Sequence, residues 1–392
     1  MPDSSPLFVH PLLGTDDAWG GFYVETVPEK ANSEALGRLA VSPLLAEFDQ
    51  RLPWFLPALA DCDQQATVIK HPVFVFPARP TPGEADALAQ REGELRRAGH
   101  KVGLIATPID KLPGTGAWDY LLIDIGHARS LPPFTLHGMA SRTTVVATGV
   151  ASQADRHWTH DNACALTTGE FLLTRASPSS KADITRMKLL KLLSLIDSDA
   201  NTDALDDIFR EEGKLAYSLL RLVNSAAMAP RSQITSYSQA INLLGRRQLQ
   251  RWLQLLVYSD PNNGQHPNPL LQKAAARGRL LELLAGRLAP ADPVEWTGDT
   301  AFMIGTFSLL DVLLGMPMAE ILHQLPLPEI AHNALARHEG PLGQLLGVID
   351  AADKRELRTA GLRLATSGVA GDDFLGAQLE AYSWAAKIRQ PA

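Results

Sequence analysis

The first half of the chain alternates short apolar runs with amphipathic stretches, whereas the second half repeats apolar residues every three to four positions. Nearly continuous apolar runs are typical of strands covered on both faces. An amphipathic stretch between Gly83 and Gly99 predicts a helix. Alternation of strands and helices predicts a parallel sheet or barrel. The predicted strands are Leu7–Leu13, Gly21–Val27, His71–Ala78, Lys101–Thr107, Asp119–Gly126 and Thr143–Val150.

A cluster of Pro and Ser residues at Thr174–Asp183 separates the two patterns and predicts a linker. Beyond it, the spacing of apolar residues is typical of amphipathic helices packed on one another. A full eight-fold α/β barrel takes about 250 residues, more than the first half offers, so we expect a trimmed barrel. We therefore predict an α/β domain at residues 1–176 and an all-α domain at residues 177–392.

Composition and charge narrow the class of protein. The 36 basic and 43 acidic side chains give a formal charge of −7, whereas nucleic acids and anionic membranes are bound by clustered cations. We expect neither as a partner. The N-terminus lacks a signal-peptide pattern and no apolar run reaches membrane-spanning length, which predicts a cytoplasmic protein. Cys62 and Cys164 have no metal-site spacing, so we expect free thiols.

A polar segment interrupts the helical pattern of the second half. Asn224 and Ser225 stand beside an apolar stripe near a predicted helix end. Ser236 and Gln239 form a capping-box pattern at the start of a short helix that ends at Gly245. We expect these side chains to satisfy backbone groups at helix termini rather than to attack a substrate.

The same segment is also typical of a helix-turn-helix, because a basic helix follows the turn. That helix carries Arg246, Arg247 and Arg251, but most of its other positions are apolar. Few side chains are left to read a DNA groove. We therefore interpret the helix as a packing element.

The stretch from Met187 to about Ser259 resembles the HDOD domain, a helical relative of the HD-type phosphohydrolases. The resemblance is carried by LLKLL at Leu189–Leu193, by RLVNSA starting at Arg221, by ITSYSQAINLLG at Ile234–Gly245 and by the apolar helix that follows. It implies a helical bundle. The motif positions that it singles out as a structural or interaction surface are Arg221, Asn224, Ser225, Ser236 and Gly245.

The chain departs from the active HD hydrolases at their metal site. In those enzymes a His-Asp pair in a helical setting binds a metal that activates water. Ser308 and Leu309 stand at the matching place, and Asp311 lies two residues further on. The resemblance therefore implies a helical domain without metal ligands or catalytic residues.

The first half resembles a degenerate EAL domain, a barrel that hydrolyses cyclic di-GMP. The matching segments are HPLLGTDDAWGGFYVETV, ELRRAGHKVGLIATP, DYLLIDIG and VVATGVASQADRHWTHDNACALTTGEFL. Chains that join EAL and HDOD domains are a known bacterial architecture. The resemblance implies a trimmed TIM-barrel-like fold, in which active members hold divalent cations with carboxylates at the carboxyl ends of strands.

Most of the EAL ligand positions have changed in this chain. Tyr23 stands in place of the name-giving Glu, with Glu25 two residues later on the same strand face. Asp124 and Gly169 are retained, so the remnant positions are Tyr23, Glu25, Asp124 and Gly169. The positions that lack the expected Asp, Lys, Glu or Gln are Ile105, Ala106, Leu122, Thr148, Ala151 and Thr168. Without those carboxylates we expect no metal site and no hydrolysis.

One further group could bind metal. His157, His160 and Asp161 lie together in HWTHD, and the two histidines share a face if the segment is helical. An exposed polar helix face is the simpler interpretation, because no further ligand is evident nearby.

The losses in both halves predict a pseudoenzyme, a bacterial signal-transduction protein that acts through protein–protein contacts with other signalling proteins and carries no cofactor. The alternative is a sensor that binds cyclic di-GMP or a related nucleotide without hydrolysis, through backbone amides and Arg side chains. A third hypothesis is a phosphodiesterase with ligands rearranged onto Glu25, Asp124 and the HWTHD group.

Overall fold

The computed structural model describes residues 6–27, 33–59, 67–81, 83–175, 248, 250–258, 268–288, 296–325 and 327–388. The chain divides into two compact units. Unit 1 contains Met1–Thr174, Ala351–Leu362 and Ala370–Leu379, and unit 2 contains Arg175–Asp350, Arg363–Val369 and Glu380–Ala392. Two segments from the second half of the chain therefore belong to unit 1.

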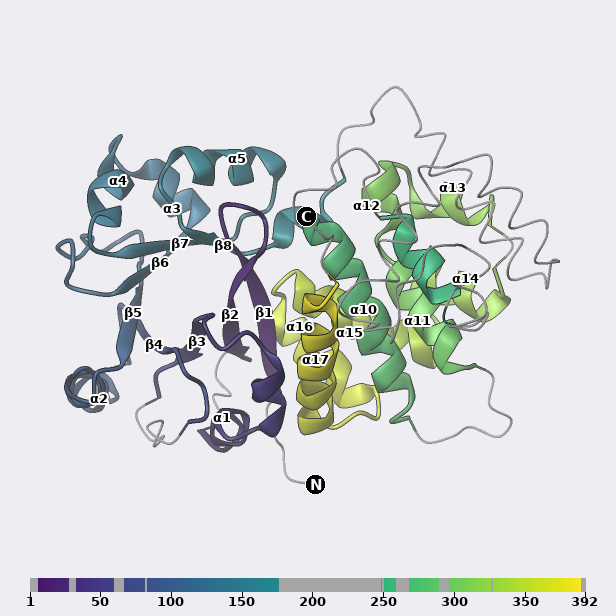
Figure 1. Cartoon of the computed structure of the whole chain (residues 1–392), viewed down its shortest axis with the longest axis horizontal. Coiled ribbons are helices and arrows are strands. Elements are labelled where there is room, and N and C mark those ends of the chain that lie inside the picture. The colour runs from purple at the N-terminus through teal and green to yellow at the C-terminus, as the bar shows by residue number, and fades with distance from the viewer. Residues whose placement is uncertain are drawn as a thin grey trace, which may run out of the picture. The chain divides into compact units, whose positions relative to one another are not determined.

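Eight strands form a closed barrel in unit 1, drawn from purple to teal in Figure 1. The first two strands pair antiparallel, the next neighbours pair in parallel up to the eighth strand, and one antiparallel pair, Leu13 with Thr167, closes the barrel. The strands are β1 (Leu7–Leu13), β2 (Trp19–Thr26), β3 (Trp54–Pro57), β4 (Pro72–Pro77), β5 (Lys101–Ile105), β6 (Tyr120–Asp124), β7 (Thr144–Thr148) and β8 (Leu166–Thr167). The α/β prediction is confirmed for this half, and all six predicted strands are present.

The helices between the strands are few and short. Turns alone join β5 to β6, and β6 runs directly into a helix that Asp124 caps. The barrel is thus trimmed in its helices and keeps all eight strands. The helical elements are α1 (Ser33–Ala40), η1 (Pro43–Glu47), α2 (Ala85–Arg97), α3 (Ile125–Ser130), α4 (Thr135–Ala140), α5 (Gln153–Asp161) and η2 (Glu170–Leu173).

Side chains fill the interior of the barrel. Tyr23 lies among them, and Phe55 meets Tyr120 edge to face with ring centroids 4.9 Å apart. A second apolar layer lies between β6, β7 and helices α3 to α5, and it buries the free thiol of Cys164. Burial raises the pKa of that thiol to about 12. The interior residues are Leu12, Tyr23, Phe55, Val73, Val75, Leu122, Val146 and Leu166, with Tyr120 at their edge.

The later segments of unit 1 pack onto β1 and β2. They come from α15 (Gly340–Asp353), α16 (Leu357–Thr366) and α17 (Gly371–Ala386). The backbone N–H of Val9 donates to the side chain of Gln378 at 3.2 Å, on a part of β1 that β8 does not reach. Phe8 and Phe374 meet edge to face, with ring centroids 5.6 Å apart. These helical segments are therefore part of the barrel's structure.

Unit 2 is helical throughout the residues described. Residues 250–256 form a helix, and Asn268 and Thr297 cap the starts of the next two helices with their side chains. The helices α10 and α11 pack at glycines: a Cβ on Gly305 would lie 2.4 Å from the carbonyl oxygen of Arg277, so no side chain fits there. The elements are α10 (Pro269–Ala285), α11 (Gly298–Phe307), α12 (Leu310–Leu314), α13 (Met318–Leu322) and α14 (Glu329–Arg337). Among the described residues, none of the helices is long and apolar enough to cross a bilayer.

Candidate functional site

The carboxyl ends of the barrel strands carry the candidate site of unit 1, as is usual for barrel enzymes. Glu25 lies near the end of β2, Asp124 ends β6, and Glu170 follows β8. Since side chains alternate along a strand, Glu25 shares with Tyr23 the face that points into the barrel. Together with His10, Glu170 and Arg355, Tyr23 and Glu25 form the mouth cluster.

Arg355 binds both glutamates of the mouth cluster. Its Nε and Nη2 atoms donate to the two carboxylate oxygens of Glu25, each at 2.7 Å, and its Nη1 donates to Glu170 at 3.2 Å. The three side chains are largely buried, with exposed fractions of 20% for Arg355, 14% for Glu25 and 12% for Glu170. A two-bond contact between a guanidinium and a carboxylate is among the stronger polar interactions in proteins.

His10 and Tyr23 complete the mouth cluster. The guanidinium carbon of Arg355 lies 5.5 Å from the centroid of the Tyr23 ring, within the range of a cation–π contact. His10 Nε2 lies 3.5 Å from Glu25. Burial tends to raise the pKa of the Glu25 carboxyl, but the hydrogen bonds and charge of Arg355, helped by His10, lower it on balance. Burial and the negative charge of Glu25 raise the pKa of Tyr23, so this phenol stays neutral.

Arg355 reaches the mouth from an unusual backbone conformation. It lies in the turn between α15 and α16 with φ of +58°, in the left-handed region that residues with a Cβ seldom adopt. The backbone N–H of Arg355 donates to the carbonyl oxygen of Ala352 at 2.8 Å. The backbone N–H of Glu356 donates to the carbonyl oxygen of Ala351 at 2.9 Å. These two hydrogen bonds are the pattern with which many helices end at a left-handed residue, so Arg355 and its neighbours cap the end of α15. From this capped turn the Arg355 side chain reaches Glu25 and Glu170.

The other remnant positions have structural roles. Asp124 is exposed and accepts from the N–H of Gly126 at 2.9 Å, which caps α3. Beside it, Gly149 has φ of +68°, and a Cβ there would lie 2.6 Å from the Asp124 carboxylate. Gly169 precedes η2 and accepts from the N–H of Leu172. The structure therefore brings together Tyr23 and Glu25, whereas Asp124 and Gly169 make their contacts elsewhere.

Two further carboxylates near strand ends, those of Asp110 and Asp155, also form ion pairs with arginines. Asp110, in the loop after β5, accepts two hydrogen bonds from Arg79 Nε and another from Nη2. Asp155, at the start of α5, pairs with Arg129 at 2.9 Å. Within the described part of the chain, no three His, Cys, Asp or Glu side chains gather as a metal-binding group.

The HWTHD residues lie on α5, as the sequence predicts for a helix. His157 Nδ1 is 2.7 Å from the carbonyl oxygen of Gln153 on the preceding turn. His157, His160 and Asp161 are all exposed. This contact ties His157 to its own helix.

In unit 2, an arginine lies beside Ser308, one of the two residues predicted from the sequence to stand in place of the His-Asp pair. Ser308 ends α11 and accepts from Arg277 Nη1 at 2.9 Å. The same Arg277 atom lies 2.7 Å from Asp350, whose other oxygen is 2.8 Å from His338. Leu309 is buried between α11 and α12. A buried guanidinium therefore lies between Ser308 and Asp350.

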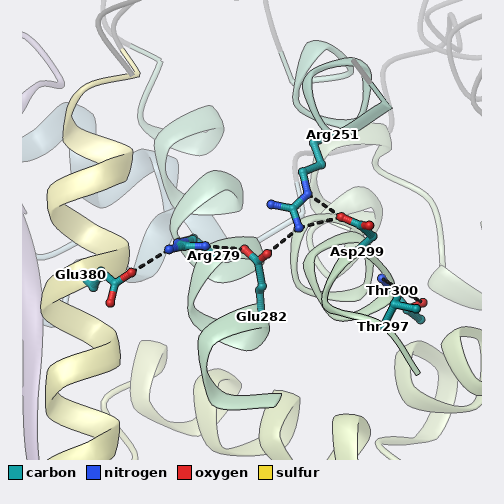
Figure 2. A network of polar contacts seen from close by, with 7 residues as sticks. All are labelled: Arg251, Arg279, Glu282, Thr297, Asp299, Thr300 and Glu380. Atoms are coloured by element: carbon teal, nitrogen blue, oxygen red, sulfur yellow. Dashed lines mark hydrogen bonds and ion pairs between the residues drawn. The ribbon is translucent and has the colours of Figure 1, made fainter. Parts of the chain in front are cut away.

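A second polar network holds the helices of unit 2 together, as Figure 2 shows. Arg251 bonds to Asp299 of α11 at 2.7 Å and also to Glu282 of α10. Arg279 joins Glu282 at 2.8 Å to Glu380 of α17 at 2.6 Å. Arg251 also lies over the ring of Phe302, 5.0 Å from its centroid. Arg251 therefore links the helix of residues 250–256 to α10 and α11.

Residues 182–308 match the family model of the HDOD domain. The C-terminal half of the chain holds an HDOD domain. The sequence prediction of an HDOD domain is thereby confirmed. Arg221, Asn224, Ser225, Ser236 and Gly245, the HDOD motif positions, lie outside the residues that the structure describes.

Two curated proteins are similar to parts of the chain. The "Uncharacterized protein YuxH" of Bacillus subtilis (strain 168) is 29% identical over 151 residues, which make up 38% of this chain and 36% of that protein. The "Cyclic di-GMP phosphodiesterase CdgJ" of Vibrio cholerae serotype O1 is 30% identical over 176 residues, 45% of this chain and 40% of that protein. The chain thus spans less than half of the length of each relative.

Sequence reasoning missed three members of the mouth cluster. His10 and Glu170 lie within the segments that resemble EAL domains but at none of the ligand positions considered, and Arg355, which is 330 positions from Glu25, lies in neither resemblance. The one usable signal was that Glu170 follows the retained Gly169 at the end of a predicted barrel segment. Nothing local in the sequence distinguishes Arg355 from its exposed neighbour Lys354.

Proposed function

We propose that the chain is a bacterial signalling protein that acts through contacts with other proteins and does not hydrolyse cyclic di-GMP. The HDOD domain and the relative named as a cyclic di-GMP phosphodiesterase suggest a signalling role. The proposal adds that unit 1 is a degenerate EAL domain. This is supported by the closed eight-stranded barrel, six of whose strands (β1, β2, β5, β6, β7 and β8) lie wholly or partly within the segments that resemble EAL domains.

The observation that carries the proposal is the binding of Glu25 and Glu170 by Arg355. Metal-assisted hydrolysis of a phosphodiester needs divalent cations, and Mg²⁺ or Ca²⁺ is bound by oxygen ligands such as free carboxylates. A guanidinium stays charged at all physiological pH values. Since Arg355 bonds to both oxygens of Glu25, a cation would have to displace it before reaching this carboxylate.

Contacts with other proteins are supported by apolar side chains on the surface of unit 1. Phe134, at the start of α4, and Ile109, in the loop after β5, are exposed. Phe134 follows two prolines and is held at φ of +63°. An aromatic side chain displayed on a constrained backbone loses little entropy when a partner binds.

A second candidate function is binding of cyclic di-GMP without cleavage. It is favoured by the similarity to a protein named for this nucleotide. If the chain binds cyclic di-GMP, the nucleotide must contact residues other than Glu25 and Glu170, because Arg355 already binds both carboxylates.

Isothermal titration of the full chain with cyclic di-GMP in the presence of Mg²⁺ or Mn²⁺ tests the proposal, with chromatography of the nucleotide afterwards. The proposal predicts no cleavage and no heat of binding. Heat with intact nucleotide would support the sensor instead. Linear or mononucleotide product would show a phosphodiesterase, provided that the chelator EDTA and the change Asp124→Asn both abolish it.

A further inference from the structure

The mouth cluster has the features of a binding site for a guanidinium group. Glu25 presents both carboxylate oxygens to one edge of the Arg355 guanidinium, and Glu170 binds another nitrogen. Tyr23 offers its ring within cation–π distance. Paired carboxylate oxygens together with an aromatic face match the planar fork of guanidinium, and an ammonium group makes poorer use of them.

The walls of this site and its occupant come from separate parts of the chain. His10, Tyr23, Glu25 and Glu170 belong to the barrel strands and to the turn after β8, whereas Arg355 lies in the turn between α15 and α16. The left-handed backbone at Arg355 ends α15 and reverses the chain there, so the Arg355 side chain is presented from a hydrogen-bonded helix cap. We propose that the barrel mouth is a guanidinium-binding site, which the chain fills with its own Arg355 so that the turn between α15 and α16 plugs the barrel.

The inference goes beyond the proposed function, since it assigns a ligand class to the mouth and a role to the turn. It is tested without nucleotide or metal. The two proposals can therefore fail separately: cleavage of cyclic di-GMP would overturn the first, and failure of guanidinium recognition would overturn the second.

Chemical rescue of Arg355→Ala in the full chain tests the plug. Thermal unfolding is measured with methylguanidinium chloride or methylammonium chloride at equal ionic strength, each corrected by the shift that it causes in the wild type. Removing Arg355 is expected to lower Tm by about 4 °C. Methylguanidinium should restore at least half of that fall, and methylammonium should restore almost none. Lys354→Ala, the exposed neighbour, should keep the wild-type Tm and show no rescue.

Several results would overturn the proposal. These are an unchanged Tm in Arg355→Ala, equal rescue by both cations, or rescue that survives the added change Glu25→Gln. If Arg355→Ala does not fold, Arg355→Lys decides, because lysine keeps the charge but cannot form the two-bond contact. A lysine variant with the wild-type Tm would show that the site does not select guanidinium, and a clear fall in Tm would support it.

Discussion

The barrel of unit 1 and the helices of unit 2 both balance buried carboxylates with an arginine, yet the two arginines differ in burial and backbone. Arg277 of unit 2 is 3% exposed and lies inside the regular helix α10. Arg355 of unit 1 is 20% exposed and lies in a turn with positive φ. Asp350, the partner of Arg277, is 22% exposed, so removing the guanidinium would leave a largely buried carboxylate without this countercharge and with His338 beside it. The comparison therefore assigns Arg277 to the scaffold and Arg355 to a more adjustable contact.

The binding partners of Arg277 and Arg355 support the same difference between the two arginines. Arg277 pairs with Asp350 and with the hydroxyl of Ser308, at the end of α11. The glycine contact between α10 and α11 fixes where Arg277 lies, because Gly305 packs against its backbone. Arg355 instead binds two carboxylates from elements far away in sequence. The position of the Arg355 side chain therefore depends on how the turn between α15 and α16 packs against the barrel.

The largest effect is expected for Arg277→Met in unit 2. The change keeps most of the side-chain volume but removes the charge opposite Asp350, so it should lower the free energy of unfolding by about 3 kcal/mol or more. Urea unfolding followed by circular dichroism measures this loss. Arg337→Met, at an exposed ion pair on α14, is the control and should leave the unfolding curve in place. A loss below about 1 kcal/mol for Arg277→Met would show that Arg277 contributes no more to stability than an exposed arginine does.

The next largest effects are expected for changes to the two glutamates of the mouth cluster, and the two losses of stability should differ in size. Glu25→Gln removes the carboxylate that makes two bonds at 2.7 Å, whereas Glu170→Gln removes the partner of one bond at 3.2 Å. We expect Glu25→Gln to cost about 2 kcal/mol and Glu170→Gln about 1 kcal/mol. The same urea experiment measures both. Equal losses, or the reverse order, would show that Arg355 is not held mainly by Glu25.

A smaller effect should appear in the dependence of stability on pH. Arg355 lowers the pKa of Glu25 despite its burial, so the stabilisation is fully present above the ordinary Glu pKa of about 4.3. It is lost as pH falls through the lower pKa of the folded state. Tm should therefore fall more steeply below about pH 4 in the wild type than in Glu25→Gln. Parallel Tm curves between pH 7 and pH 3 would contradict this assignment.

The smallest effect is expected at an exposed pair of the barrel. Arg79 and Asp110 form a two-bond contact like that of Arg355 and Glu25, but both side chains are open to solvent. Water and salt weaken such pairs. Arg79→Ala should therefore leave Tm unchanged within error. A fall like that of Arg355→Ala would show that two-bond geometry, rather than burial, sets the strength of these contacts.

Strand prediction succeeded where a strand was long and apolar. The predicted range Leu7–Leu13 equals β1, and the other five predictions contain or overlap their strands. The strands β3 and β8 were missed because four and two residues carry too little pattern to recognise.

The candidate site could be predicted only in part. Glu25 was found because it lies two positions from Tyr23, on the same strand face. Arg355 was not, because its role depends on tertiary packing and on a turn conformation that arginine seldom adopts. The domain boundary at residues 176 and 177 followed from a composition change, which could not reveal that Ala351–Leu362 and Ala370–Leu379 pack within unit 1.

Arg355, and not a metal ion, is proposed to balance the carboxylates of the barrel mouth. Titration of the wild-type chain with Mn²⁺, followed by the electron paramagnetic resonance of the free ion, decides between the two. We expect no stoichiometric binding at micromolar Mn²⁺, and the same titration curve for the wild type and for Glu25→Gln. One tightly bound Mn²⁺ per chain that disappears in Glu25→Gln would contradict it.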